Sequence, residues 1–183
     1  MRIVAGTARG RPLLAPKGRQ IRPTSDRVRE SLFNVLGQWM DGLRVLDLYA
    51  GTGALALEAL SRGAARAVLV DQDREAAGLC RQNAEALGFA DRAEILALPV
   101  SRAAPLLAHR NEPFDLVFAD PPYAARAVGD TLEVVSAQGL LAPGGTLVVE
   151  HDRRETAPER HEALIRVDQR RFGDTLVSLY RFA

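Results

Sequence analysis

Apolar residues follow two different spacings in the first 42 positions of the chain. Two short apolar runs, 1–5 and 11–15, are separated by glycines, and this pattern predicts a small hairpin. Further on, apolar residues recur every three or four positions, which indicates a helix that buries one face. The residues on that face are Val28, Leu32, Val35, Leu36 and Trp39.

From residue 43 short apolar runs alternate with segments of helical spacing. The runs are nearly continuous, as in strands that are buried on both faces of a parallel sheet. They lie at 43–48, 65–71, 93–98, 114–119 and 146–151. Regular alternation of strands and helices predicts an α/β fold whose sheet is covered by helices on both faces.

The end of the chain departs from this alternation. Two runs with strand character, 162–172 and 175–182, flank Gly173 and Asp174, a pairing typical of an antiparallel hairpin turn. The sequence therefore predicts a mostly parallel, seven-stranded sheet that is closed by a C-terminal antiparallel hairpin. The only candidate boundary lies near residue 41, so we expect a small N-terminal extension (1–41) and a main domain (42–183).

Composition narrows the class of protein. The chain has 183 residues, is 47% hydrophobic and 26% charged, and holds a single cysteine, Cys80. One cysteine excludes an internal disulfide, and three scattered histidines give no metal-ligand spacing, so we expect no metal. No apolar run approaches the ~20 residues of a membrane span, and no signal-peptide pattern is visible. These features favour a cytoplasmic protein, and the lack of a spare apolar helix favours a monomer.

Charge is distributed unevenly along the chain. Residues 1–40 carry eight basic and two acidic side chains, a net charge of +6, whereas the remainder carries −5. Such separation suggests a surface that faces a polyanion, although a solvated basic segment gives the same pattern.

A glycine-rich loop follows the first predicted strand. Gly51 and Gly53 lie between this strand and a helix, where backbone can approach a ligand closely, and Asp71 ends the second strand. An acid at that position accepts hydrogen bonds from ribose hydroxyls, so a dinucleotide or another nucleoside would fit. Asp47, just before the loop, would repel a pyrophosphate but would favour a cationic amino-acid group. S-adenosylmethionine therefore suits these residues better than a dinucleotide.

A second motif, Asp120-Pro121-Pro122-Tyr123, follows the fourth predicted strand. Proline has no N–H and fixes the backbone, so the turn presents acceptors, the Asp120 carboxylate and the Pro121 carbonyl, in a rigid frame. Tyr123 adds a flat face for stacking. Acceptors beside a stacking ring suit a planar amino group on a base. If that amine accepted a methyl group from the cofactor, Asp120 could take up the proton that the amine loses.

Three stretches together resemble the RsmD family of small-subunit ribosomal RNA methyltransferases. They are IRPTSDRVRESLFNVL at 21–36, VLDLYAGTGALALEALSRGA at 45–64 and DPPY at 120–123. The resemblance implies a Rossmann-like class I methyltransferase fold and methyl transfer from S-adenosylmethionine to the exocyclic N2 of a guanine. Adenine methyltransferases and other amino-group enzymes also carry DPPY, so the stretch at 21–36 is the more specific sign of the RsmD family.

The resemblance also assigns residues to the cofactor and to RNA. Those implied to contact the cofactor are Asp47, Tyr49, Gly51, Gly53, Asp71, Gln72, Leu98 and Val100. Related enzymes often place an acid after the third strand to contact adenine, but Pro99 stands near that position here. The implied RNA contacts, on the basic N-terminal segment, are Arg9, Arg11, Arg22, Arg27 and Arg29. The implied partner is small-subunit ribosomal RNA in an assembly intermediate.

Other functions fit parts of the pattern. The amino-group motif also permits adenine-N6 methylation of RNA or DNA, and a protein glutamine methyltransferase would usually carry Asn in place of Asp120. The glycine loop alone would serve a dinucleotide-dependent oxidoreductase, and the basic segment alone would serve a non-catalytic RNA-binding module.

Overall fold

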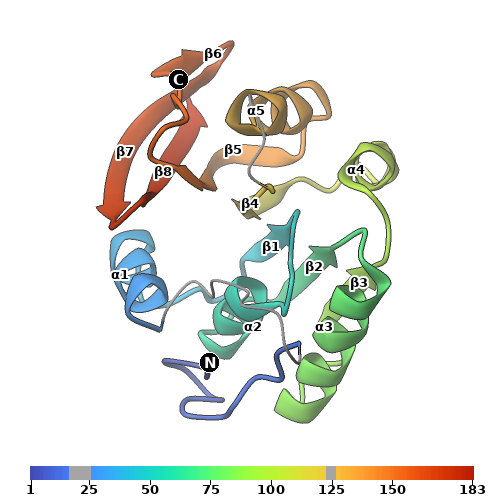
Figure 1. Ribbon diagram of the computed structural model, residues 1–183. Coiled ribbons are helices and arrows are strands. Elements are labelled where there is room, and N and C mark those ends of the chain that lie inside the picture. Colours follow the sequence, from blue (N-terminus) through green and yellow to red (C-terminus); the bar gives the residue numbers. More distant parts are fainter. Residues whose placement is uncertain (17–25, 123–126) are drawn as a thin grey trace.

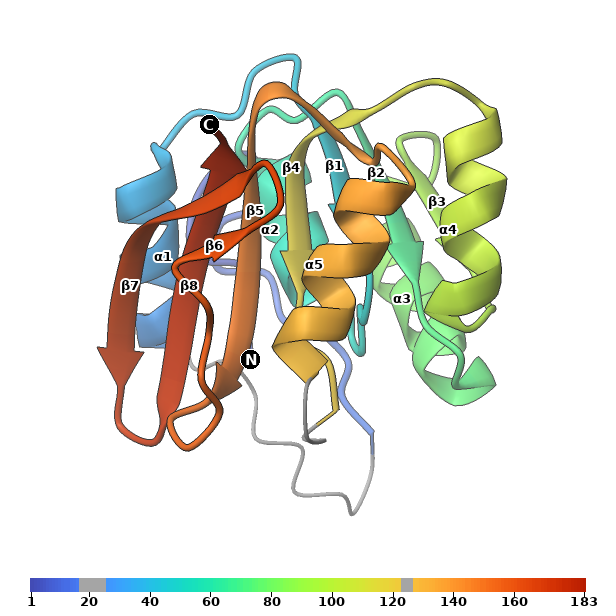
Figure 2. The ribbon, with the colours of Figure 1, turned by 90° about the horizontal axis from the view of Figure 1, so that it is seen from above.

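An eight-stranded sheet lies between two layers of helices in the computed structural model of the protein, which describes residues 1–16, 26–122 and 127–183 (Figure 1, Figure 2). The strands are β1 Arg44–Asp47, β2 Arg66–Val70, β3 Ala93–Leu96, β4 Phe114–Ala119, β5 Leu141–Asp152, β6 Arg160–His161, β7 Leu164–Phe172 and β8 Thr175–Phe182. The helices are α1 Asp26–Leu36, α2 Ala54–Ser61, α3 Arg74–Leu87, α4 Val100–His109 and α5 Ala127–Ala137.

The strand order is β3-β2-β1-β4-β5-β8-β7-β6. Strands β1 to β5 are parallel, and β8 adds to β5 in the antiparallel sense, followed by β7 and β6. This arrangement confirms the predicted mostly parallel sheet with a C-terminal hairpin. The sheet has eight strands rather than seven because Arg160–His161 pairs with the start of β7, and two residues are too few to show an alternating pattern.

Both faces of the parallel part of the sheet are covered by helices, as the continuous apolar runs predicted, whereas most side chains of β7 are at least partly exposed. Side chains on one face, such as Val45 and Phe118, pack with α1, α2 and α3. Side chains on the other face, such as Leu46 and Val117, pack with α4 and α5. Figure 1 shows the two helical layers on opposite sides of the sheet. None of the helices in the described ranges is long and apolar enough to cross a membrane.

Helix α1 buries a different set of side chains from the predicted one. Leu32 and Phe33 are buried, and the Phe33 ring centroid lies 5.9 Å from that of Phe118 in β4. Trp39, expected on the buried face, is 77% exposed, and Val35 is also exposed. The helix ends at Leu36, and Gly37 follows with a φ of 102°, so Trp39 no longer continues the helical face.

Residues 1–16 pack into the same hydrophobic cluster as α2 and α3. The predicted hairpin is reduced to one antiparallel bridge between Arg2 and Pro12. Ile3 and Leu13 are buried in the cluster that also contains Phe33. The segment therefore adds a layer outside α2 and α3 (Figure 1), while its assignment as a separate RNA-facing extension stays a prediction.

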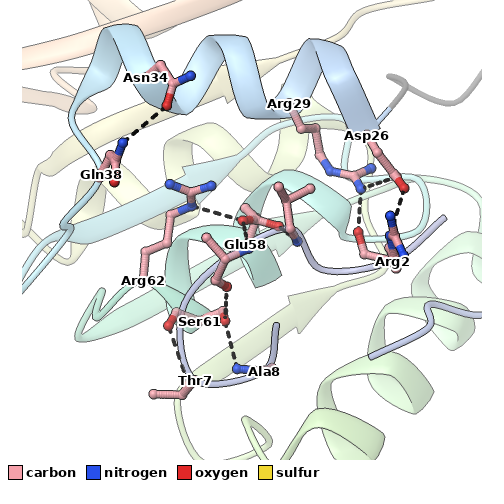
Figure 3. Close-up of polar contacts among 12 residues, drawn as sticks. Arg2, Thr7, Ala8, Asp26, Arg29, Asn34, Gln38, Glu58, Ser61 and Arg62 are labelled. Atoms are coloured by element: carbon pink, nitrogen blue, oxygen red, sulfur yellow. Dashed lines mark hydrogen bonds and ion pairs between the residues drawn. The ribbon is translucent and has the colours of Figure 1, made fainter. Parts of the chain in front are cut away.

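A buried carboxylate on α2 holds the N-terminal segment. Glu58 accepts hydrogen bonds from the backbone N–H of Val4 at 2.7 Å and of Ala5 at 2.9 Å, and it pairs with Arg62 one turn further on (Figure 3). Neither Glu58 nor Arg62 is more than 4% exposed. Ser61 adds a second attachment, because its hydroxyl donates to the carbonyl of Ala5 and accepts from the N–H of Ala8.

Replacing Glu58 by Ala is expected to lower the free energy of unfolding by about 3 kcal/mol, because it leaves buried Arg62 and two backbone donors without their acceptor. Urea denaturation measures the change. Glu112→Ala is the matched control: Glu112 forms an exposed pair with Arg44, and its removal should cost less than about 1 kcal/mol. Equal losses in the two variants would show that Glu58 does not anchor the segment.

Candidate active site

A cleft of about 450 Å³ opens at the carboxyl ends of the parallel strands. Strand order reverses between β1 and β4, because β1 continues toward β2 on one side and β4 toward β5 on the other. Ligands of open parallel sheets bind at such a reversal. The cleft is lined by residues that follow four strands: Leu48, Tyr49, Asp71, Gln72, Asp73, Pro99, Val100, Ser101, Asp120 and Pro122.

The glycine loop and the end of β2 are joined by one carboxylate. Asp71 accepts a hydrogen bond from the N–H of Gly51 at 2.9 Å through one oxygen and from the N–H of Asp73 at 2.9 Å through the other. Gly51 and Gly53 adopt φ values of 56° and 79°, which favour glycine. Asp73 caps α3 by accepting from Glu75 N–H. The loop is therefore fixed against the second strand.

Asp47 lies beneath the glycine loop and does not line the cleft. It is 2% exposed and accepts hydrogen bonds from the backbone N–H groups of Tyr49 and Ala56. Burial raises the pKa of this carboxyl to about 7, and the nearby charge of Asp71 adds to the increase. Of the residues predicted for the cofactor, Tyr49, Asp71, Gln72 and Val100 line the cleft, whereas Asp47, Gly51, Gly53 and Leu98 lie outside its lining.

The start of α4 forms one wall of the cleft. Pro99 precedes the helix, and its carbonyl accepts from the N–H groups of Arg102 and Ala103. Val100 and Ser101 line the cleft, while Leu98 is half-buried against the cluster on the α4 and α5 face. Ser101 was not predicted, although its place in the first turn of a helix after β3 was a signal that could have identified it.

Asp120 and Pro122 close the cleft on the side of β4, and Pro121 is buried behind them. Tyr123 lies outside the described residues. Burial raises the pKa of Asp120 to about 8, and the charges of Glu150 and Asp47 contribute to the increase. The site thus concentrates carboxylates that a cationic ligand or hydrogen-bond donors would stabilise in their ionised form.

The basic residues predicted to contact RNA have different environments. Arg9 and Arg11 are exposed, and the Arg11 guanidinium donates to the carbonyl of Ala86 in α3. Arg22 lies outside the described residues, and the side chain of Arg27, in α1, is likewise not described. The prediction for Arg29 is wrong. This side chain is fully buried and donates to Asp26 and to the carbonyl of Arg2, so it holds the N-terminal segment instead of facing solvent (Figure 3).

Asn83 connects the glycine loop to the N-terminal segment. Its side-chain amide donates to the carbonyl of Thr52 in the loop at 2.9 Å and to the carbonyl of Leu14 at 3.1 Å. Its oxygen accepts from the N–H of Leu14 at 2.7 Å. The residue is 1% exposed, so these bonds satisfy a buried polar group. No sequence pattern pointed to it, because an Asn inside a helical pattern usually faces solvent.

One group of potential metal ligands forms on the surface despite the absence of metal-ligand spacing in the sequence. Ligand atoms of Glu133, His161 and Glu162 lie within 4.8 Å of one another. His161 hydrogen-bonds to Glu133 at 3.0 Å, and Glu162 accepts from the hydroxyl of Ser136 at 2.7 Å. These contacts account for the cluster as hydrogen bonding between α5 and the β6–β7 turn, and we assign no metal to it.

Replacing Asp120 by Asn is expected to stabilise the protein at pH 8 and to change its stability little at pH 4. Between these values the folded state keeps a proton on Asp120 that the unfolded state has released, so the wild-type free energy of unfolding falls as pH rises. Asn carries no charge at either pH. Urea denaturation of both proteins at several pH values gives the difference, and a constant difference across this range would contradict the raised pKa.

Comparisons with known proteins agree with this architecture. The family described as Conserved hypothetical protein 95 matches residues 1–181. A Bacillus subtilis protein named "Putative rRNA methyltransferase YlbH" is 36% identical, over 99% of this chain and 98% of its own length. The Escherichia coli K12 protein named Ribosomal RNA small subunit methyltransferase D is 38% identical, over 86% of this chain and 78% of its own length.

A solved structure shows the same fold. A Thermus thermophilus protein described only as hypothetical superposes with a TM-score of 0.85, at 34% sequence identity, over 99% of both chains. The family match spans almost the whole chain, and two relatives above 30% identity cover most of it. The chain therefore belongs to the Conserved hypothetical protein 95 family, the RsmD and YlbH group.

Proposed function

We propose that the protein transfers a methyl group from S-adenosylmethionine to the exocyclic N2 of a guanine in small-subunit ribosomal RNA. The family to which it belongs is one of S-adenosylmethionine-dependent rRNA methyltransferases. The observation that supports methyl transfer to an amino group is the position of Asp120 and Pro122, which line the same cleft as Tyr49, Asp71 and Gln72. The choice of guanine in small-subunit rRNA rests on the resemblance of residues 21–36 to the RsmD family and on the 38% identity with the small-subunit rRNA methyltransferase D of Escherichia coli.

The residues of the cleft fit the cofactor. A Cβ built on Gly51 would meet no protein atom within 4 Å, so the backbone there faces open space that a ligand can occupy. Asp71 offers carboxylate oxygens beside Gln72 at the end of β2, where ribose hydroxyls would donate. Val100 and the first turn of α4 would enclose the adenine, and Tyr49 and the glycine loop the methionine portion. When bound, the cofactor supplies an electrophilic methyl group on a sulfonium.

The Asp-Pro-Pro turn would hold the target amine. An aromatic amine is a weak nucleophile because its lone pair is delocalised into the ring. Two fixed acceptors, the Asp120 carboxylate and the Pro121 carbonyl, would bind both amine protons and orient the lone pair, so that orientation and placed dipoles lower the barrier. Asp120 would accept the proton that the nitrogen loses, and a bound cation nearby would favour the ionised carboxylate this requires.

The exposed arginines of the N-terminal segment would position the RNA through its phosphates. Arg9 and Arg11 remain candidates for this role, together with Arg22 and Arg27. The target guanine would leave its stack to reach Asp120. We take the substrate to be small-subunit rRNA within an assembly intermediate.

The reaction can be tested with small-subunit particles from cells that lack the gene. Incubation with cofactor labelled in the methyl group, followed by nucleoside mass analysis, should give N2-methylguanosine at one rRNA position. Label on N6-methyladenosine, on protein, or on no RNA would overturn the proposal. Naked rRNA, assayed in parallel, shows whether assembly is required.

Asp120→Ala should retain affinity for S-adenosylhomocysteine within about threefold while turnover falls at least about tenfold, since the acceptor acts on the amine and not on the cofactor. Calorimetric titration and single-turnover methyl transfer measure the two quantities. If the turnover of Asp120→Ala equalled that of the wild type, the Asp-Pro-Pro sequence would have only a structural role as a turn.

Gly51→Ala and Gly53→Ala should separate cofactor binding from folding. A Cβ on Gly51 points into open space, so this variant should lose at least about tenfold in S-adenosylhomocysteine affinity, at a backbone cost of about 1–2 kcal/mol. A Cβ on Gly53 would lie 2.8 Å from Leu69 Cδ2, so this variant should be the less stable of the two. Titration and urea denaturation test both, and unchanged affinity in Gly51→Ala would place the cofactor elsewhere.

A further inference from the structure

Three acidic side chains project from the same face of the sheet at the carboxyl ends of adjacent strands. Asp47 ends β1, Asp120 follows β4, and Glu150 lies near the end of β5. Asp47 is paired in register with Phe118, and Ala119 with Val149, so that Asp120 comes beside Glu150. Because side chains alternate along a strand, Asp120 shares the face of Phe118, and Glu150 the face of Val148. Phe118 and Val148 both belong to the cluster under α1 and α2.

Asp120 therefore has an acid on each side. Neighbouring strands lie roughly 4.8 Å apart, which brings the side chains of Asp120 and Glu150 within reach of a single planar ligand. The electrostatic influence of Glu150 and Asp47 on Asp120 agrees with this proximity. Asp120 and Glu150 are both half-buried. Glu150 is next to Asp120 and does not itself line the cleft. Ionised carboxylates only accept hydrogen bonds, so a ligand that reaches past Asp120 toward Glu150 would need an edge rich in donors.

The edges of the purine bases differ at the atom next to the target amine. In guanine the ring nitrogen N1 carries a hydrogen, so N1 and the N2 amine form an unbroken row of donors. In adenine the N1 beside the amine is an acceptor. With the amine on Asp120, the guanine N1–H would donate to a neighbouring carboxylate, whereas the adenine N1 lone pair would be repelled by it. A site built for a donor rejects a ligand that lacks it.

We propose that Glu150 selects guanine by accepting a hydrogen bond from its N1–H while Asp120 holds the N2 amine. This inference rests on the proposed guanine-N2 activity and adds to it a residue outside the Asp-Pro-Pro turn. Glu150 also takes part in another interaction of the protein. A carboxylate has about four lone-pair positions, so it can accept the N1–H as well.

The base 2-aminopurine provides the probe, because it keeps the exocyclic amine at C2 but carries no hydrogen on N1. The guanosine that the wild-type enzyme modifies is first mapped and then replaced by 2-aminopurine riboside in the reconstituted particle. Methyl transfer to both substrates is measured for the wild type and for Glu150→Gln. The wild type should lose about tenfold to a hundredfold in kcat/KM on 2-aminopurine, as expected for loss of a good base contact.

Glu150→Gln should accept 2-aminopurine better than the wild type does. The amide can donate to the bare N1 of 2-aminopurine, so the ratio of 2-aminopurine to guanine activity should rise at least about tenfold relative to the wild type. Both enzymes should bind S-adenosylhomocysteine equally, which excludes misfolding as the cause. Glu112→Gln, at the opposite end of the sheet and exposed, is the matched control and should keep the wild-type ratio.

The outcomes separate the two proposals. If the wild type modifies no guanine, the proposed function fails before Glu150 is tested. If it modifies guanine but Glu150→Gln keeps the wild-type ratio of the two substrates, Glu150 does not read N1. A loss of activity on both substrates in equal proportion would also overturn the inference and would assign Glu150 to structure alone.

Discussion

The reversal of strand order between β1 and β4 is the constraint on which the site depends. Helices cover both faces of the sheet, so polar chemistry is confined to its edges. At the reversal, connections from β1 and β4 leave in opposite directions, and the carboxyl ends of four strands open onto one cleft. Each strand then contributes the residues that follow it: Leu48 and Tyr49 after β1, Asp71 to Asp73 after β2, the start of α4 after β3, and Asp120 and Pro122 after β4. The residues of the site are far apart in the sequence, and the strand order brings them together at one cleft.

This arrangement places acids where they are costly in the absence of a ligand. Asp47 and Asp120 each have a raised pKa because burial disfavours their charged forms and because they face other carboxylates. Hydrogen bonds from Tyr49 and Ala56 offset part of this cost at Asp47. In the proposed reaction a sulfonium cation and the N–H donors of an amine would offset the remaining cost of ionising these carboxylates. The same carboxylates that weaken the folded state alone are thus suited to a cationic cofactor and a donor-rich substrate.

Sequence reasoning succeeded where the information was local or periodic. The alternation of apolar runs predicted the parallel sheet and its two helical layers. It failed where tertiary contacts override local pattern. Arg29, one of several arginines in a basic stretch, turns inward to bind a backbone carbonyl. Trp39 is exposed because the helix ends three residues earlier. Buried Glu58 and Asn83 resemble ordinary helix-surface residues, since their partners lie 54 and 69 residues away along the chain.

Those separations also bear on the order in which the chain can fold. The N-terminal segment is synthesised before the residues that hold it, because Val4 binds Glu58 and Leu14 binds Asn83. Ile3 and Leu13, both buried in the finished protein, have no place to pack until α2 and α3 have emerged from the ribosome. Closure of such long loops costs entropy that only the assembled helices offset. Residues 1–16 can therefore take up their final position only once α2 and α3 are in place, and Asn83 then joins them to the glycine loop.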